Sequence, residues 1–228
     1  MILTEKYLKD PIHTLAIPLW KHNTTAIRQD MMYVIDENFN EMLYRDFKDT
    51  LYLRLKHDLL NLKLSKIPNH YCFSSYKESD GVLIYNVLKE CYGDEIEYDK
   101  IDHMIKDETF NDLLCVFLYN EKVFNLENFI HLRKLNNDKE KNYKPLGLVI
   151  AQFDQKTKEA SIEYLCVLEK YREKGLGTLL LQEILIRISN IADFATVSFK
   201  KEGNEHLEKL FRDAGFEGNA VWHMLRKQ

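Results

Sequence analysis

The chain has few of the residues that mark several common classes of protein. Its 228 residues include eight glycines, four prolines and four cysteines, with no Cys-x-x-Cys pair among Cys72, Cys91, Cys115 and Cys166. This wide spacing argues against a disulfide framework or a metal site and indicates reduced, buried thiols. No apolar run approaches the roughly 20 residues that span a bilayer, and the first residues lack a signal-peptide pattern. We therefore expect a cytoplasmic protein with no membrane partner and no metal.

Two further absences narrow what the chain can bind. The formal net charge is −4, whereas nucleic-acid surfaces carry a basic excess, so no nucleic-acid partner is expected. The sequence has no Gly-x-x-x-x-Gly-Lys-Ser/Thr run, which excludes a P-loop. It also lacks the Gly-x-Gly-x-x-Gly turn of a Rossmann unit. A phosphate site, if the chain has one, must be built differently.

Enough apolar residues are present for a packed core, because 45% of the chain is hydrophobic and 12% is aromatic. Residues 1–68 show the weakest pattern. Met31–Ile35 predicts a short strand, and the leucines between Leu51 and Leu64 predict a helix. We interpret residues 1–68 as an N-terminal extension packed on the core.

From residue 70 the apolar periodicity predicts a regular alternation of elements. A charged loop is expected at 121–144. The expected strands are Tyr71–Tyr76, Leu113–Tyr119, Leu146–Phe153, Ala160–Val167, Ala195–Phe199 and Phe216–Leu225, and the expected helices are Asp80–Tyr92, Glu97–Phe110, Thr178–Ile191 and one that opens at Asn204.

The most informative motif lies between an expected strand and an expected helix. It reads Tyr171-Arg172-Glu173-Lys174-Gly175-Leu176-Gly177. Glycines permit tight turning and close approach of the backbone to a ligand. The N–H groups and the positive dipole end of the following helix favour an anion. The segment therefore predicts an anion site that suits a diphosphate, although glycines at a helix start are often only a turn.

The element order, this motif and the late helix Asn204–Phe216 with its Gly-Phe ending resemble the GNAT superfamily of acyl-CoA-dependent N-acetyltransferases. The resemblance covers residues 69–228, taken as the acetyltransferase domain. Val221–Leu225 is similar to the end of poorly characterised bacterial members with an added N-terminal segment. The resemblance implies an α/β fold with a central mixed, mostly antiparallel sheet flanked by helices.

The resemblance also implies acetyl-CoA as co-substrate. Its diphosphate would lie on the glycine turn, and its pantetheine arm would lie along a bulged strand near Leu165 and Val167. The resemblance implies that Asn204 contacts that arm, and an asparagine that opens a helix is also an ordinary N-cap; the two roles are compatible. The cofactor-binding residues implied are Leu165, Cys166, Val167, Arg172, Glu173, Lys174, Gly175, Leu176, Gly177, Thr178, Asn204 and Phe211.

The catalytic residues are less clearly marked. Glu163, where some family members carry a carboxylate, could deprotonate the acceptor amine. Alternatively, it could form a cross-strand ion pair with a lysine on the exposed side of the sheet. His223 is the other candidate base, and a histidine in a strand is often structural. Phe211 stands where many members have a tyrosine that protonates the leaving thiolate. Cys166 has no local histidine partner and is interpreted as a core thiol rather than a nucleophile.

We therefore expect an N-acetyltransferase that moves an acetyl group from acetyl-CoA to a primary amine of a small molecule or peptide by direct attack. Two alternatives remain open: transfer of a different acyl group, and a non-catalytic CoA-binding regulatory domain of the same fold. The second is supported by Phe211 and by the unexplained N-terminal segment. A homodimer is compatible with the sequence.

Overall fold

The computed structural model describes residues 2–22, 31–62, 66–106, 113–120 and 144–227. Within these ranges lies one mixed eight-stranded sheet with the order β1-β8-β2-β7-β6-β5-β4-β3. The predicted α/β fold with a mixed, mostly antiparallel sheet and flanking helices is confirmed. No helix in the described ranges is both long enough and apolar enough to cross a bilayer. The chain divides into two compact units, one of residues 1–62, 153–162 and 188–228, the other of residues 63–152 and 163–187.

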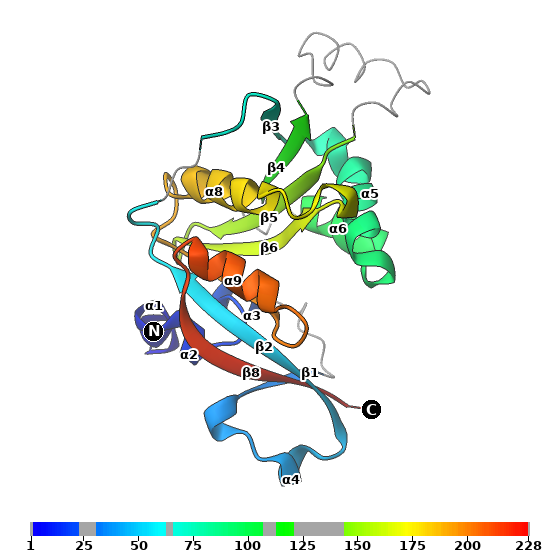
Figure 1. Cartoon of the computed structure of the whole chain (residues 1–228). Coiled ribbons are helices and arrows are strands. Elements are labelled where there is room, and N and C mark those ends of the chain that lie inside the picture. The colour runs from blue at the N-terminus through cyan, green and yellow to red at the C-terminus, as the bar shows by residue number, and fades with distance from the viewer. Residues whose placement is uncertain (1, 23–30, 63–65, 107–112, 121–143, 228) are drawn as a thin grey trace. The chain divides into compact units, whose positions relative to one another are not determined.

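The second unit contains most of the elements that the sequence predicts between residue 70 and the helix after the glycine turn. Helices α5 and α6 lie on one face of its strands and α8 lies on the other (Figure 1). Apolar side chains of α5 and α6, among them Ile84, Leu88 and Ile101, pack with Phe117 and Ile150 of the strands. The elements are β3 (Tyr71–Ser75), η2 (Glu78–Asp80), α5 (Gly81–Tyr92), η3 (Gly93–Glu95), α6 (Tyr98–Lys106), β4 (Leu113–Asn120), β5 (Gly147–Asp154), η5 (Glu169–Tyr171) and α8 (Leu176–Ile188).

The antiparallel pairings of this unit follow the predicted strands closely. Strand β3 pairs with β4 from Tyr71↔Asn120 to Ser75↔Val116. Strand β4 pairs in turn with β5, whose residues are all buried. The predicted helix Glu97–Phe110 is found as α6, with residues 107–110 outside the described ranges. The charged loop expected at 121–144 also lies outside them, apart from residue 144.

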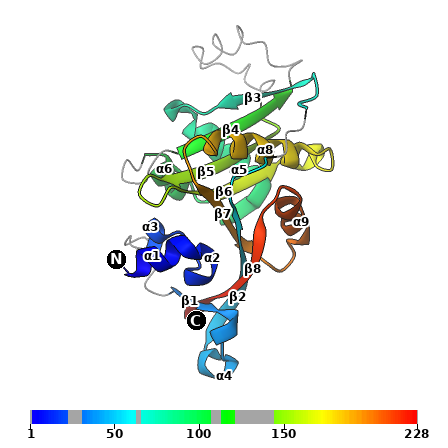
Figure 2. The same ribbon diagram turned by 90° about the vertical axis from the view of Figure 1, so that its left-hand side faces the viewer.

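The first unit holds both ends of the chain. Helices α1–α3 lie on one side of β2 and β8, and α9 lies on the other (Figure 2). The indole Nε1 of Trp222 donates to the Ile12 carbonyl at 2.8 Å, which ties α2 to β8. The elements are α1 (Ile2–Lys9), α2 (Pro11–Thr14), α3 (Leu19–His22), β1 (Met31–Ile35), η1 (Asp36–Asn38), α4 (Glu41–Tyr44), β2 (Phe47–His57), β7 (Phe194–Lys200), α9 (Glu205–Asp213) and β8 (Glu217–Lys227).

Strand β6 (Glu159–Val167) is continuous, and its first four residues belong to the first unit. These residues pair in parallel with β7, from Glu159↔Phe194 to Ile162↔Val197. The other pairings of the first unit are antiparallel. This single parallel ladder makes the sheet of the described chain a mixed one.

The helix predicted from Leu51 to Leu64 is wrong. Residues 47–57 form strand β2, which is hydrogen-bonded to β7 on one edge and to β8 on the other. The leucines at Leu51, Leu53 and Leu55 alternate with period two, as a strand requires. Arg54, between two of them, is nevertheless fully buried. The strand predicted at Met31–Ile35 is confirmed as β1. Residues before 69 thus contribute two strands to the sheet.

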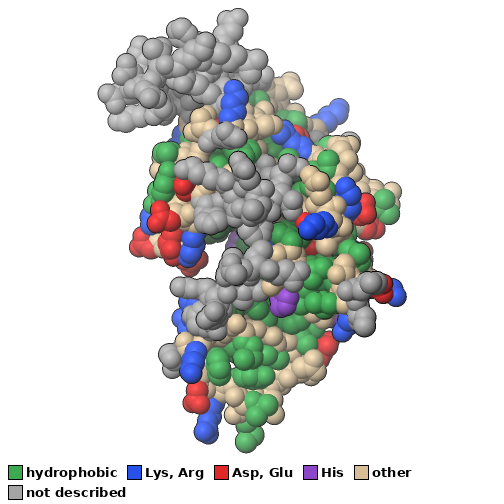
Figure 3. Space-filling model, turned by 180° about the vertical axis from the view of Figure 1, so that it is seen from behind, with side chains coloured by type: hydrophobic (Ala, Val, Ile, Leu, Met, Phe, Trp, Pro, Cys, Tyr) green, Lys and Arg blue, Asp and Glu red, His purple; other side chains and the backbone are tan. Residues whose placement is uncertain are grey.

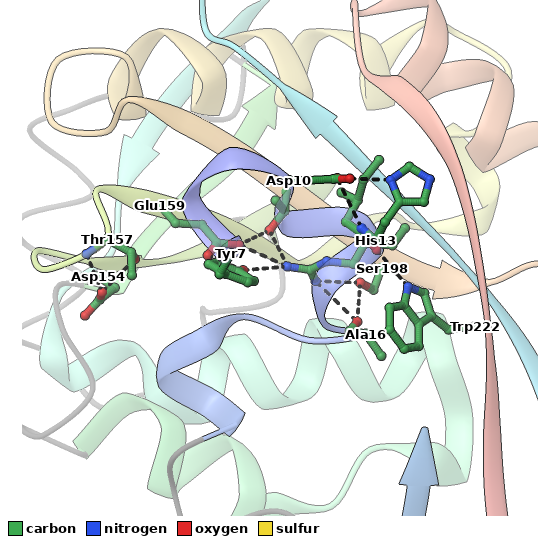
Figure 4. A network of polar contacts seen from close by, with 12 residues as sticks. Tyr7, Asp10, His13, Ala16, Asp154, Thr157, Glu159, Ser198 and Trp222 are labelled. Atoms are coloured by element: carbon green, nitrogen blue, oxygen red, sulfur yellow. Dashed lines mark hydrogen bonds and ion pairs between the residues drawn. The ribbon is translucent and has the colours of Figure 1, made fainter. Parts of the chain in front are cut away.

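A buried polar network joins α1 to this part of the sheet (Figure 4). The Arg54 guanidinium lies 3.1 Å from the Glu159 carboxylate, and both side chains are almost fully buried. The hydroxyl of Tyr7 donates to the other oxygen of Glu159 at 2.5 Å, and Thr196 donates to the first. Arg54 also donates to Ser198 at 3.0 Å. The N-terminal helix is therefore held to the sheet by hydrogen bonds to a buried ion pair.

Apolar side chains gather at the end of this unit that carries α4 (Figure 3). Met42 is 84% exposed and Leu43 is 70% exposed.

Candidate functional site

The turn between β6 and α8 combines a short 3-10 helix with two left-handed residues. After η5, Glu173 has φ 61° and Gly175 has φ 74°. A left-handed conformation suits glycine best, because a side chain there is strained. Leu176 is 1% exposed and anchors the start of α8. The predicted glycine turn is therefore a true reversal of the chain directly before a 13-residue helix.

The turn leaves space and hydrogen-bond donors for a ligand. A Cβ built on Gly175 would meet no atom within 4 Å. The first N–H groups of a helix have no acceptor inside that helix, and the helix dipole adds partial positive charge at the same end. Open space beside unsatisfied donors is the arrangement that an anionic group requires.

Exposed cationic side chains border the turn. Arg172 bends back, and its Nε donates to the Val167 carbonyl at 3.0 Å. Lys174 donates to the Lys170 carbonyl at 3.4 Å. The ammonium groups of Lys170 and Lys174 also lie over the Tyr171 ring, at 4.9 Å and 5.5 Å from its centroid respectively. The positive charges are thus held near the turn by backbone and ring contacts, and they complement a diphosphate.

The second half of β6 leads into the turn and packs against the end of α5. The Tyr92 hydroxyl donates to the Leu165 carbonyl at 2.9 Å, and its ring makes an edge contact with Tyr164. Burial is the main cause that raises the pKa of Tyr92, which keeps the hydroxyl protonated as a donor. On the β5 side, a Cβ at Gly147 would lie 2.4 Å from the Cys166 carbonyl oxygen, so only glycine fits there.

Two cysteines of this unit share one apolar cluster. Cys166 of β6 is buried within the cluster, and Cys91 of α5 packs against it. The Cys166 hydrogen bond and the Arg172 charge lower the pKa of Cys91, although burial opposes them. The contact with Cys91 and burial raise the pKa of Cys166 well above its usual range. The sequence prediction missed Cys91, because nothing near it marks a contact with a residue so distant along the chain.

Glu163, the first candidate base, lies half-buried on β6. Burial, followed by the charge of Glu163, raises the pKa of the adjacent Tyr164. Glu163 belongs to the same unit as Leu165, Cys166, Val167 and the whole glycine turn. Its role as a base stays a prediction.

Asn204 and Phe211 belong to the other unit. Asn204 stands at the start of α9 without capping it through its side chain. Its Nδ2 instead donates to the Lys200 carbonyl at 2.9 Å. Phe211 is 2% exposed and stacks on Phe199 with a centroid distance of 5.6 Å, while Phe216 meets it edge-on. The contacts of both residues with a cofactor stay predictions.

His223 also belongs to the first unit, on β8. Its Nδ1 lies 2.6 Å from Asp49 and its Nε2 lies 3.0 Å from Asp36. The Phe39 ring stacks on the imidazole with a centroid distance of 3.5 Å. Both ring nitrogens are therefore engaged by carboxylates, an arrangement that suits a structural role better than proton transfer to a substrate. In the described residues, these three side chains included, no three His, Cys, Asp or Glu side chains form a group that could hold a metal ion.

The described geometry agrees with a match to a known family. The model of the acetyltransferase (GNAT) family matches residues 82–216, which is more than half of the chain. The chain therefore belongs to the GNAT acetyltransferase family. A search of curated proteins finds no match.

Solved structures support the same fold at low identity. A GCN5-related N-acetyltransferase from Sphaerobacter thermophilus aligns with a TM-score of 0.62 and 13% identity over 98% of this chain and 64% of its own. One from Kribbella flavida aligns with a TM-score of 0.56 and 12% identity over 86% and 67%. A functionally unknown protein from Staphylococcus epidermidis aligns with a TM-score of 0.58 and 14% identity over 99% and 81%.

The chain does not span the full length of every protein that it resembles. It covers 54% of a Drosophila protein that aligns with 82% of this chain at a TM-score of 0.55 and 12% identity. These likenesses show the fold, and the reaction has to be argued from the residues of this chain.

Proposed function

We propose that the protein is an N-acetyltransferase that binds acetyl-CoA at the glycine turn and transfers its acetyl group to a primary amine. The geometry of the turn is the observation that carries the proposal. Gly175 is left-handed and its Cβ position is open, the N-terminus of α8 follows at once, and Arg172 and Lys174 flank it. These features fit a diphosphate, which the family membership associates with an acyl-CoA.

Binding of the co-substrate is tested by isothermal titration calorimetry with CoA, ATP and NAD. CoA should bind best, and Gly175→Val should abolish that binding, because the side chain fills the open space and strains the turn. Gly203→Val is the matched control, since Gly203 has φ 76° and a Cβ there would also meet no atom within 4 Å. Undiminished CoA affinity in the Gly175 variant would show that the diphosphate lies elsewhere.

We assign the base role to Glu163, which lies on the strand that leads into the turn. A primary amine is protonated at neutral pH, so it must lose a proton before it can attack. Acetyl-CoA supplies an activated acyl group, and the carboxylate of Glu163 accepts the proton directly or through a water molecule. His223 is the weaker candidate, because Asp36 and Asp49 already engage both of its ring nitrogens.

Turnover of Glu163→Gln tests this role. General-base catalysis contributes about a hundredfold or more, so turnover should fall by about that factor. CoA affinity should hardly change, because the contacts proposed along β6 are with the backbone. A variant with unaltered turnover and pH profile would exclude Glu163 as the base.

A non-catalytic CoA-binding domain is the second candidate, and the packing of Phe211 favours it. That side chain is 2% exposed between two other rings and carries no hydroxyl to protonate a thiolate. Acetyl-CoA turnover against a broad panel of amines and peptides separates the two functions. An enzyme acetylates at least one acceptor, whereas a regulatory domain binds acetyl-CoA and acetylates none.

A further inference from the structure

Strand β6 has one backbone edge that is paired along only part of its length. Its first four residues, Glu159–Ile162, form the parallel ladder with β7, and within the described residues that ladder ends there. Just beyond β6, the Leu168 N–H donates to the Leu146 carbonyl, on the side of β5. A trans peptide points its C=O opposite to its N–H, so the Val167 carbonyl points away from β5. The Leu165 carbonyl, two residues earlier, points to the same edge.

Both of these carbonyls accept a hydrogen bond from a side chain of the same unit. The Tyr92 hydroxyl donates to the Leu165 carbonyl at 2.9 Å, and the Arg172 Nε donates to the Val167 carbonyl at 3.0 Å. The two donors are not held equally firmly. Tyr92 is half-buried and its ring contacts Tyr164, whereas Arg172 is exposed. The Arg172 contact is therefore the one that can open without repacking.

The position of Arg172 gives its guanidinium a second partner when a ligand is present. Arg172 is the first residue of the motif Arg172–Gly177, which we propose as the diphosphate site. A bond from a guanidinium to a phosphate is about twice as strong as one to a neutral acceptor, and it is often bidentate. A diphosphate on the turn therefore binds Arg172 better than the Val167 carbonyl does.

We propose that Arg172 is a clasp on the acyl-CoA site, which closes the Val167 carbonyl in the free protein and releases it when the diphosphate binds. This inference rests on the proposed function, in which the turn holds the diphosphate and the pantetheine arm lies along β6. The arm carries two amide N–H groups, and a free carbonyl on a strand edge accepts such a group as it accepts a backbone N–H. The diphosphate thus opens the acceptor for the arm of the same ligand.

Two fragments of CoA separate these events. Pantetheine carries the arm without phosphate, and 3′-phospho-ADP carries the diphosphate without the arm. Ligand-observed NMR titrations of the full chain give the dissociation constant of pantetheine with and without saturating 3′-phospho-ADP. The two conditions differ by one hydrogen bond, so pantetheine should bind about two- to tenfold more tightly when the nucleotide is present.

Two variants that each remove one positive charge from the turn isolate the clasp. Arg172→Met should bind 3′-phospho-ADP more weakly, yet it should bind pantetheine alone as tightly as the wild type does with nucleotide. In this variant the nucleotide should no longer change the affinity for pantetheine. Lys174→Met is the matched control, because Lys174 donates to the Lys170 carbonyl and not to β6. It should also weaken nucleotide binding, but the nucleotide should still strengthen pantetheine binding.

Tyr92→Phe tests which of the two carbonyls the arm needs. This variant frees the Leu165 carbonyl and leaves Arg172 on Val167, so the effect of the nucleotide on pantetheine affinity should persist. The Nε–H resonance of Arg172 in ¹⁵N-labelled wild-type protein follows the contact directly, even where a variant fails to fold. It should be protected from exchange with water in the free protein and should shift when 3′-phospho-ADP is added.

Several results would overturn the clasp while CoA binding still supports the proposed function. One is pantetheine that binds no more tightly, or not at all, in saturating 3′-phospho-ADP. Another is an effect of the nucleotide that survives in Arg172→Met or disappears in Tyr92→Phe. A wild-type protein that binds neither CoA nor 3′-phospho-ADP would overturn both proposals, so the two failures are distinguishable.

Discussion

Replacing Glu159 by glutamine should strongly destabilise the first unit. The carboxylate is fully buried and lies 3.1 Å from Arg54, whose side chain is 1% exposed. Burial raises the pKa of the Glu159 carboxyl, and the Arg54 guanidinium with the hydroxyl donors of Thr196 and Tyr7 opposes that rise. Glutamine removes the negative charge and leaves the guanidinium buried without a counter-charge. Breaking such a pair typically costs about 3–5 kcal/mol.

The neighbouring hydroxyl provides a graded comparison. Tyr7→Phe keeps the ring and removes only the hydrogen bonds to Glu159 and Arg54. Hydrogen bonds to charged groups contribute about 1.5–3 kcal/mol, so this variant should lose less stability than Glu159→Gln. A double variant with both changes should lose less than the sum of the two, because the residues share one network.

Urea denaturation followed by circular dichroism and tryptophan fluorescence measures these changes. Trp222 reports on the first unit, because its indole nitrogen is hydrogen-bonded to Ile12 in α2. The combined change Arg54→Met with Glu159→Leu is the sharpest control, since replacing both charges by apolar groups is often neutral or stabilising. If Glu159→Gln alone lowers the free energy of unfolding by less than about 1 kcal/mol, then loss of the carboxylate does not leave a costly unpaired charge on Arg54. That result would refute the reasoning.

Two further predictions concern other tight contacts. Gly215 has φ 103°, and a Cβ there would lie 2.9 Å from Nε2 of the buried His57, so Gly215→Ala should lower the free energy of unfolding in urea by more than about 1 kcal/mol. Because the Cys166 hydrogen bond and the Arg172 charge lower the pKa of Cys91, iodoacetamide should alkylate Cys91 at pH values below the ordinary thiol pKa of about 8.5. In Arg172→Gln that rate profile should move to higher pH, and an unmoved profile would contradict the contact.

The sequence predicted the core elements from residue 70 and the glycine turn because each depends on neighbouring residues. The turn needs a glycine at Gly175 to take a positive φ, and the helix after it needs only its own apolar spacing. Gly215 could be predicted for the same reason, because it lies directly after the late helix and has a positive φ of 103°. Its contact with His57 adds a reason for glycine that spacing alone does not contain.

Strand β2 shows why the N-terminal region could not be interpreted. Leu51, Leu53 and Leu55 alternate with other residues as a strand requires, but further leucines follow at 59, 60, 62 and 64 without that alternation, and the combined run has the apolar density of a helix. Arg54 is accommodated only because Glu159 lies opposite it, 105 positions further along the chain. A pattern of leucines with a charge among them was therefore assigned to a helix.

The cysteines Cys91 and Cys166, like this ion pair, are distant from each other in the sequence. Such pairs cannot be predicted from local sequence patterns. The anion site that we propose at the turn depends on six consecutive residues, Arg172–Gly177, so a local motif can predict it without knowledge of the fold. A side-chain pair such as Cys91 with Cys166 exists only once α5 has packed on β6, and either cysteine alone is indistinguishable from a core thiol. The pKa of Cys91 is then lowered by two residues, Cys166 and Arg172, that lie far from it in the sequence. Chemistry that depends on the backbone can thus be predicted locally, whereas chemistry that depends on packed side chains requires the structure.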